Sequence, residues 1–173
     1  MTIEKLNTGT LFSQLDEATN VFHSLIKSAD ENKIHVVPFA GSWTVAQLAS
    51  HVTKSNKAIV QALGMPGEPA HRNADERVKE LKKMFLDFNT KFQSPEFIMP
   101  TKEMHSKKEV IEKYDNSAER LKTLRSKTNL SEVISLPLFG EITKFEILYF
   151  VLYHTQRHIH QLKNMLHIIN HKN

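Results

Sequence analysis

Apolar residues recur every three or four positions along most of the chain, and this spacing predicts amphipathic helices. The predicted helices cover about residues 10–28, 44–64, 78–92, 106–124 and 143–169. No stretch alternates convincingly between apolar and polar residues, so we expect no strands. The predicted fold class is therefore all-α, a four-helix bundle with a short extra helical insertion.

Three short motifs mark helix starts. In each, a Ser or Thr is followed three residues later by Glu or Gln, which forms a capping box that satisfies free N–H groups of the first turn. The three pairs are Thr44 with Gln47, Ser106 with Glu109, and Thr143 with Glu146. No internal repeat, low-complexity tract or linker divides the chain, so we predict one domain over residues 1–173.

The composition narrows the chemistry. The chain has no Cys, which excludes disulfides, thiolate metal sites and a cysteine nucleophile, so any metal ligands must be His or carboxylates. Basic and acidic residues are intermixed, and the net charge of +4 favours a solvated helix surface over a nucleic-acid interface. The chain starts without a signal-peptide pattern, and its most apolar run, residues 147–153, is far shorter than the ~20 residues that span a bilayer. We therefore expect a cytoplasmic protein with no membrane or nucleic-acid partner.

Two of the ten histidines lie on the inward face of the last predicted helix. Its stripe reads Ile147, Val151, His154, His158, Leu162, Met165 and Ile169. Side chains four residues apart share a helix face, about 5–6 Å apart at Cβ, so both rings can reach one ion. Such a pair is a standard half of a metal site, although a lone histidine on an apolar face is more often a core residue with a satisfied hydrogen bond.

The second predicted helix offers a third ligand. His51 lies at the border of its buried face, and ligands in helical bundles usually come from facing helices. We therefore predict one divalent metal ion, with Zn, Ni, Fe or Mn as candidates, held by His51, His154 and His158. Three protein ligands leave a coordination position open, as in catalytic sites. His167 and His171 have the same spacing but lie on a polar face, where the helix dipole explains exposed histidines.

Other residues have candidate supporting roles. Gln161 and Ser55 are placed to accept a ring N–H from a ligating histidine. Tyr114 could contact substrate, but a core tyrosine with a satisfied hydroxyl is the simpler interpretation. Arg157 could meet an anionic substrate or form a surface salt bridge. The remaining histidines considered, His23, His35, His71 and His105, are expected to be surface or packing residues.

Two segments resemble the DinB-like superfamily of metal-binding four-helix bundles, which includes the YfiT-like hydrolases. One is SWTVAQLASH, residues 42–51, in which a Trp precedes a capped helix and a His follows. The other is LFGEITKFEILYFVLYHTQRHIHQ, residues 138–161. The resemblance is weak from Met65 to Thr128. Carried over by position, the family's metal ligands are His51, His154 and His158, and the implied fold is a bundle with crossover connections that is often a homodimer.

The resemblance implies a metal-dependent hydrolase or a thiol S-transferase. Some relatives look like transferases acting with bacillithiol or glutathione, others are mycothiol-dependent isomerases, and most have no known reaction. The expected partner is a small-molecule substrate, with a low-molecular-weight thiol as one candidate. Two alternatives stay open: a non-catalytic bundle that binds or senses a metal or small ligand, and a metal-free interaction bundle whose stability is insensitive to chelator.

Overall fold

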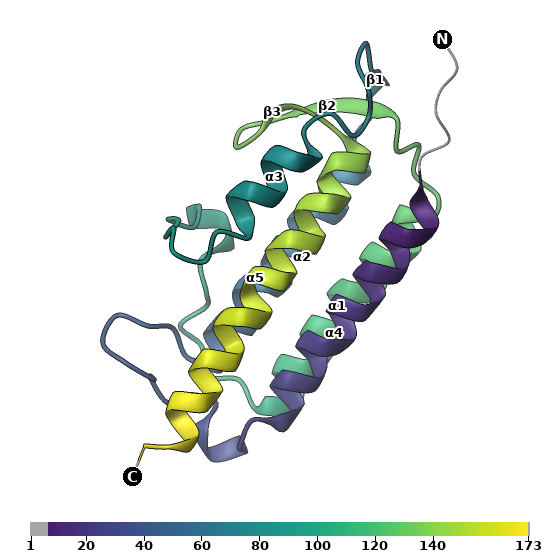
Figure 1. The fold of residues 1–173 in the computed structure, drawn as a ribbon. Helices are drawn as coiled ribbons and strands as arrows, with labels where there is room; N and C mark the ends of the chain where they lie inside the picture. Colours follow the sequence, from purple (N-terminus) through teal and green to yellow (C-terminus); the bar gives the residue numbers. More distant parts are fainter. Residues whose placement is uncertain (1–6, 173) are drawn as a thin grey trace.

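The computed structural model describes residues 7–172, and helices dominate that part of the chain (Figure 1). The long helices are α1 (Thr8–Ser28), α2 (Val45–Leu63), α4 (Lys107–Arg125) and α5 (Lys144–Asn170), and the short helix is α3 (Val78–Phe85). The strands are β1 (Glu68–Pro69), β2 (Glu132–Leu136) and β3 (Gly140–Thr143), and the two 3-10 turns are η1 (Glu31–Lys33) and η2 (Glu96–Ile98). The mostly helical four-helix bundle is thus confirmed, with a small sheet added.

The four long helices form a bundle with a crossover. Strand β1 follows α2 and pairs with β2, which follows α4, so α2 and α4 both end at the sheet. Helix α5 begins directly after β3 and runs away from the sheet, parallel to α1 (Figure 1). Because α2 and α4 point the same way, residues 64–106 must run back along the whole bundle from the end of α2 to the start of α4. This crossover connection contains α3 and η2.

All three predicted capping boxes are present. The backbone N–H groups of Thr44, Ser106 and Thr143 donate to Gln47, Glu109 and Glu146 at 2.9, 2.8 and 3.0 Å. Each cap hydroxyl in turn accepts the N–H of the residue three positions later. These reciprocal bonds fix the starts of α2, α4 and α5, two of which carry the candidate ligands.

The core consists of two apolar clusters, one at each end of the bundle. The cluster near the sheet includes Leu11, Ile147 and Val151, and the cluster at the far end includes Phe22 and Met165. Along α5, His154 and His158 fall between the two clusters. The candidate ligands therefore lie at mid-height in the bundle, surrounded by packed helices.

The expectation of a strand-free chain is wrong at one end of the bundle. Strand β2 pairs with β1 on one side and with β3 on the other, both antiparallel. The hairpin from β2 to β3 turns over residues 137–139 and re-enters the sheet at Gly140, whose φ of 63° suits glycine. The longest strand has five residues, too few to show a clear alternation of apolar and polar residues. These segments are extended because they pair with one another, and their local sequence preference is weak.

The third helix is shorter than its apolar spacing suggests. It ends at Phe85, so Phe88 and Phe92 lie in the irregular segment beyond it and are about half exposed. Asp87 explains the stop, because its carboxylate accepts the N–H of Asn89 at 3.1 Å and so offers the backbone a turn in place of a further helical bond.

A buried carboxylate ties the crossover connection to α5. Glu146 is 0% exposed and accepts two bonds from the Arg72 guanidinium at 2.6 and 2.7 Å, plus the N–H groups of Arg77 at 2.8 Å and Thr143 at 3.0 Å. Burial alone would raise the pKa of Glu146, but these donors outweigh it and hold the pKa below its ordinary value. The network fixes where α3 begins relative to α5.

Within residues 7–172, no helix has both the length and the apolar content needed to cross a bilayer.

Candidate metal centre

The three predicted ligands meet at one point between two helices. His51 comes from α2, and His154 and His158 come from successive turns of α5. Their Nε2 atoms are 3.2 Å apart for His51 and His154, and 3.1 Å apart for each of the other two pairs. All three side chains are buried, at 2, 7 and 7% exposure. We call this set the histidine triad.

The outer ring nitrogens of two triad members are held by oxygen atoms. Nδ1 of His51 lies 2.9 Å from the backbone carbonyl oxygen of Ile98, at the end of η2. Nδ1 of His158 lies 2.9 Å from Oε1 of Gln161, one turn further along α5. Both oxygens can only accept, so each Nδ1 carries the hydrogen, and each Nε2 turns an unprotonated lone pair toward the centre.

This arrangement directs the unprotonated Nε2 lone pairs of His51 and His158 toward one another, with neither ring supplying a hydrogen between them. The lone pairs of His51 and His158 face each other across 3.1 Å, a distance that needs a hydrogen or a cation between them. Only His154 could supply a hydrogen, because no acceptor for its Nδ1 is found among residues 7–172. One hydrogen cannot bond fully to two Nε2 acceptors, so the Nε2 lone pairs of the triad are suited to bind a cation.

Electrostatics keep the triad neutral. Burial lowers the pKa of His51, against the opposing effect of its bond to Ile98. Burial, helped by the other two rings and Arg157, lowers the pKa of His154 well below its usual value. Burial also lowers the pKa of His158 to about 3. Since only the neutral imidazole binds a metal, no ligand has to lose a proton near pH 7.

The spacing fits a tetrahedral ion. Imidazole nitrogens bound to one tetrahedral Zn at about 2.0–2.1 Å lie about 3.3 Å from one another. The observed separations of 3.1 and 3.2 Å come close to this. Within residues 7–172, the triad is also the one group of three or more His, Asp or Glu whose ligand atoms gather within 4.8 Å. The donor set, its protonation and its spacing all suit a divalent cation.

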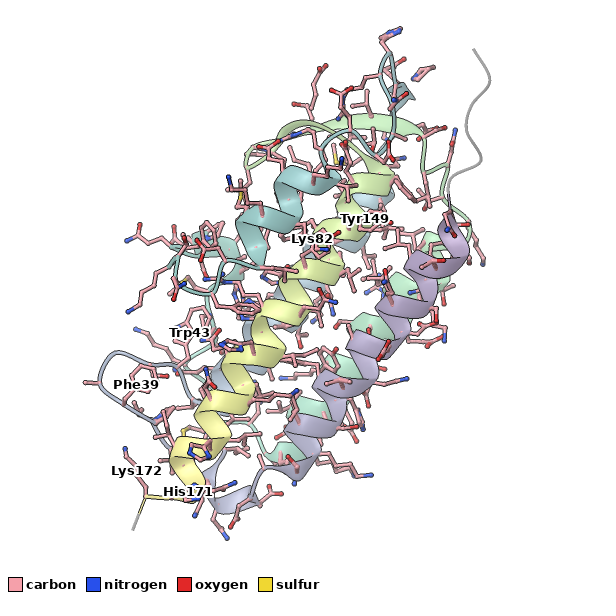
Figure 2. All side chains as sticks on the ribbon, in the orientation of Figure 1. Phe39, Trp43, Lys82, Tyr149, His171 and Lys172 are labelled. Atoms are coloured by element: carbon pink, nitrogen blue, oxygen red, sulfur yellow. The ribbon has the colours of Figure 1, made fainter. Side chains whose placement is uncertain are left out.

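Aromatic side chains surround the triad and limit its contact with water. The ring of Trp43 lies 4.9 Å from that of His51, and Phe150 and Phe85 lie 5.1 and 6.3 Å from His154, measured between centroids. Trp43 immediately precedes the cap of α2, beside α5 (Figure 2). A low local dielectric of this kind strengthens the interaction of any charge placed at the centre.

Among the described residues Arg157 forms no surface salt bridge with a carboxylate, and its contact with an anionic substrate stays a prediction. Its guanidinium donates to the backbone carbonyl oxygens of Phe85 at 3.3 Å and Asp87 at 2.8 Å, and also to that of Thr90. It lies 4.8 Å above the ring of Phe92. Three of its five N–H groups thus bind the backbone of residues 85–90, and these bonds position the segment after α3 beside the triad.

The other supporting predictions have mixed outcomes. Gln161 contacts His158 as predicted, whereas Ser55 is not the partner of His51, because the carbonyl of Ile98 takes that place. Tyr114 is a core residue, 1% exposed, whose hydroxyl donates to the carbonyl of Thr19. His23, His35, His71, His105, His167 and His171 all lie outside the triad.

Sequence reasoning missed the carbonyl of Ile98. A backbone oxygen has no residue signature, and Ile98 lies 47 positions from His51 in an irregular segment. The only available signal was indirect: the prolines at 95 and 100 bracket a segment expected to be irregular.

Comparison with known proteins identifies the family. Residues 14–162 match the family described as the DinB superfamily. The uncharacterised protein YuaE of Bacillus subtilis (strain 168) is 22% identical over 147 residues, which cover 81% of this chain and 87% of that protein.

Two solved structures share the fold. TT2238, described as a four-helix bundle protein, superposes with a TM-score of 0.60 at 17% identity, over 90% of this chain and 98% of its own. YfiT from Bacillus subtilis, described as a probable metal-dependent hydrolase with an unusual four-helix bundle topology, superposes with a TM-score of 0.59 at 16% identity, over 95% of this chain and 88% of its own. With most of its length matched by the family description and its fold shared with these bundles, the chain belongs to the DinB superfamily.

Proposed function

We propose that this protein is a metal-dependent hydrolase of small molecules, with one divalent ion held by Nε2 of His51, His154 and His158. The observation that carries the proposal is the convergence of three neutral imidazole nitrogens in a buried centre. The similarity to YfiT, itself described as a probable metal-dependent hydrolase, supports the reaction class.

Each group around the centre has a defined task. The carbonyl of Ile98 and the amide of Gln161 hold two of the rings in the tautomer that binds a metal. Trp43 and Phe150 exclude water from the ligand side. No carboxylate belongs to the described ligand group, so the chain does not neutralise the charge of the ion.

A divalent ion bound there supplies Lewis acidity, which lowers the pKa of water from 15.7 to about 7 and equally favours the deprotonated form of a thiol. Thiol S-transfer is therefore the second candidate reaction. The ligand set supports it, because three His ligands leave a position open to a thiolate as well as to water.

The first experiment measures metal content. Untagged protein, purified without added metal, is analysed by inductively coupled plasma mass spectrometry beside His51→Ala, His154→Ala and His158→Ala. The matched control is His167→Ala, which removes an exposed histidine of the same helix. We expect about one ion per chain in the wild type and in the control, and loss of the ion in each triad variant.

Circular dichroism of every variant separates loss of the ligand from loss of the fold. A folded triad variant that retains its full metal content would refute the site. Failure of the wild type to bind Zn, Ni, Fe or Mn after refilling would refute the proposed chemistry. With the ion established, ester and amide substrates and small thiol acceptors are screened in parallel, and the triad variants serve as inactive controls.

A further inference from the structure

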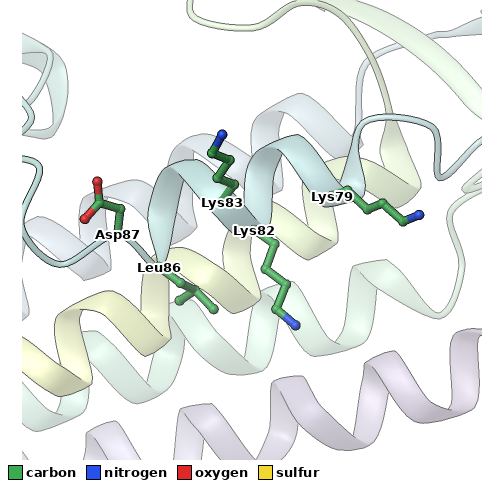
Figure 3. Close-up of a pocket in the computed structure, with 5 residues that line it drawn as sticks. All are labelled: Lys79, Lys82, Lys83, Leu86 and Asp87. Carbon is green, nitrogen blue, oxygen red and sulfur yellow. The ribbon is translucent and has the colours of Figure 1, made fainter.

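Two surface hollows among the described residues lie outside the triad and contain lysines. The first is lined by Lys79, Lys82, Lys83, Leu86 and Asp87 of α3 and the residues after it. Figure 3 shows its three lysines pointing in different directions, with the Asp87 carboxylate on the same hollow. Side chains that diverge from one short helix do not define a ligand position, so this hollow carries no inference.

The second hollow is a groove between three parts of the chain. It has a volume of about 440 Å³ and is bounded by α2, by the segment 101–105 and by α4. Lysines reach it from all three sides: Lys54 and Lys57 from α2, Lys102 from the segment, and Lys113 from α4. We call it the lysine groove, and its size lies in the range of small-molecule sites.

The lining of the lysine groove holds four lysines against one glutamate, with Glu109 just outside the lining and near Lys113. Glu103 is the one acidic residue in its lining, and its carboxylate lies 3.1 Å from Nε2 of His105. None of the four groove lysines forms a salt bridge among residues 7–172. Lysines that outnumber the nearby carboxylates repel one another, and a bound anion reduces that repulsion.

Part of the groove is pre-organised. Nζ of Lys54 donates to the carbonyl of Met99 at 2.6 Å, and Nζ of Lys113 lies 2.8 Å from Nε2 of His105. Hydroxyl groups of Thr53 and Thr101 line the same space. Two cations are thus anchored, one from α2 and one from α4, and Thr53 and Thr101 belong to the same lining.

The donor types favour one class of anion. The lining contains lysines and hydroxyls but no arginine, so it lacks the planar fork that matches a carboxylate in two-point contact. Lysine acts as a point charge and is a common phosphate ligand. We propose that the lysine groove binds a phosphorylated small molecule, with the phosphate between Lys54, Lys57, Lys102 and Lys113.

The test uses inorganic pyrophosphate as the probe. ¹⁵N-labelled protein is titrated and followed by amide chemical shifts, beside the double variant Lys57→Gln/Lys102→Gln. Both of these lysines are exposed and have no hydrogen-bond partner among the described residues, so the fold should not suffer. The matched control is Lys82→Gln/Lys83→Gln, which removes the same charge from α3.

We expect saturable shifts confined to α2 near Lys54, to residues 101–105 and to α4 near Lys113. The affinity should be about five-fold weaker in the groove variant and unchanged in the control. Affinity should also fall as salt is added. Absence of saturation at about 10 mM pyrophosphate, or equal weakening by both double variants, would overturn the proposal.

Two further arms separate the groove from other binding modes. Pyrophosphate also binds divalent metals, so the titration is repeated with His154→Ala, and binding at the groove should persist. Loss of pyrophosphate binding in that variant would place the probe at the triad and overturn the groove proposal. The proposed hydrolase is tested separately, by metal content. Citrate supplies clustered carboxylates, and citrate binding tighter than pyrophosphate would overturn the assignment to phosphate.

Discussion

Replacing Glu146 with Gln tests whether the crossover connection is held by one buried carboxylate. The substitution keeps the size of the side chain but removes its charge and turns one oxygen into an NH₂ group, which would face donors from Arg72, Arg77 and Thr143. Breaking a buried ion pair by removing one partner costs about 3–5 kcal/mol. Because Arg72 keeps 22% exposure and can recover water, we expect a smaller cost than for a fully buried pair, about 2–3 kcal/mol.

Urea unfolding followed by circular dichroism measures this difference, and the melting temperature should fall by about 4–12 °C. The pKa of folded Glu146 is depressed, so its stabilisation is present above the ordinary value of 4.5 and is lost as the pH falls through the lower folded pKa. The gap between wild type and variant should therefore shrink below about pH 4.5.

Glu80→Gln is the matched control for this experiment. It breaks an exposed pair with Arg77, in which the Glu80 side chain is 57% exposed, and should cost less than about 1 kcal/mol. A Glu146 variant as stable as this control at pH 7, or a gap that widens in acid, would refute the reasoning.

Three further perturbations follow from contacts described above. Gln161→Leu removes the acceptor of His158 and should weaken metal binding about 10–100-fold in a chelator competition, whereas Gln161→Glu should retain it. Arg157→Gln releases backbone carbonyls of residues 85–90, so amide hydrogen exchange there should accelerate about tenfold while the helical signal is unchanged. Gly67→Ala would place a Cβ 2.8 Å from Cβ of Glu132 and should cost about 1–3 kcal/mol in thermal unfolding, while Gly9→Ala, which meets open space, should not destabilise.

Local chemistry explains which parts of the fold could be predicted. The starts of α2, α4 and α5 depend on capping boxes that act within four residues, and all three are where the sequence places them. The end of α3 was missed because Asp87 makes a turn that competes with an apolar spacing still periodic at Phe88 and Phe92. The sheet was missed because its strands are short and are extended only when paired.

The candidate site also contains residues that local spacing can predict and one that depends on tertiary folding. His154 and His158 could be paired from helical spacing, and His51 was added by its place on a facing helix and by the family resemblance. Their meeting is confirmed by the structure, and metal binding stays a prediction. Gln161 lies within one turn of His158 and was accessible to the same spacing argument. Ile98 was not, because its role depends on how the crossover connection folds back over α2.

That fold-back gives the short segment from Ile98 to Thr101 two attachments with different consequences. The carbonyl of Ile98 holds His51, while the carbonyl of Met99 holds Lys54 at the wall of the lysine groove. The segment is thus a shared boundary between triad and groove, so a ligand that displaced it at one site would also move a contact of the other. Thermodynamic linkage makes such an effect reciprocal. If a groove ligand changes the affinity for the metal ion by some factor, the metal ion changes the affinity for that ligand by the same factor. Measuring either affinity with and without the other component would give the coupling free energy between the two sites.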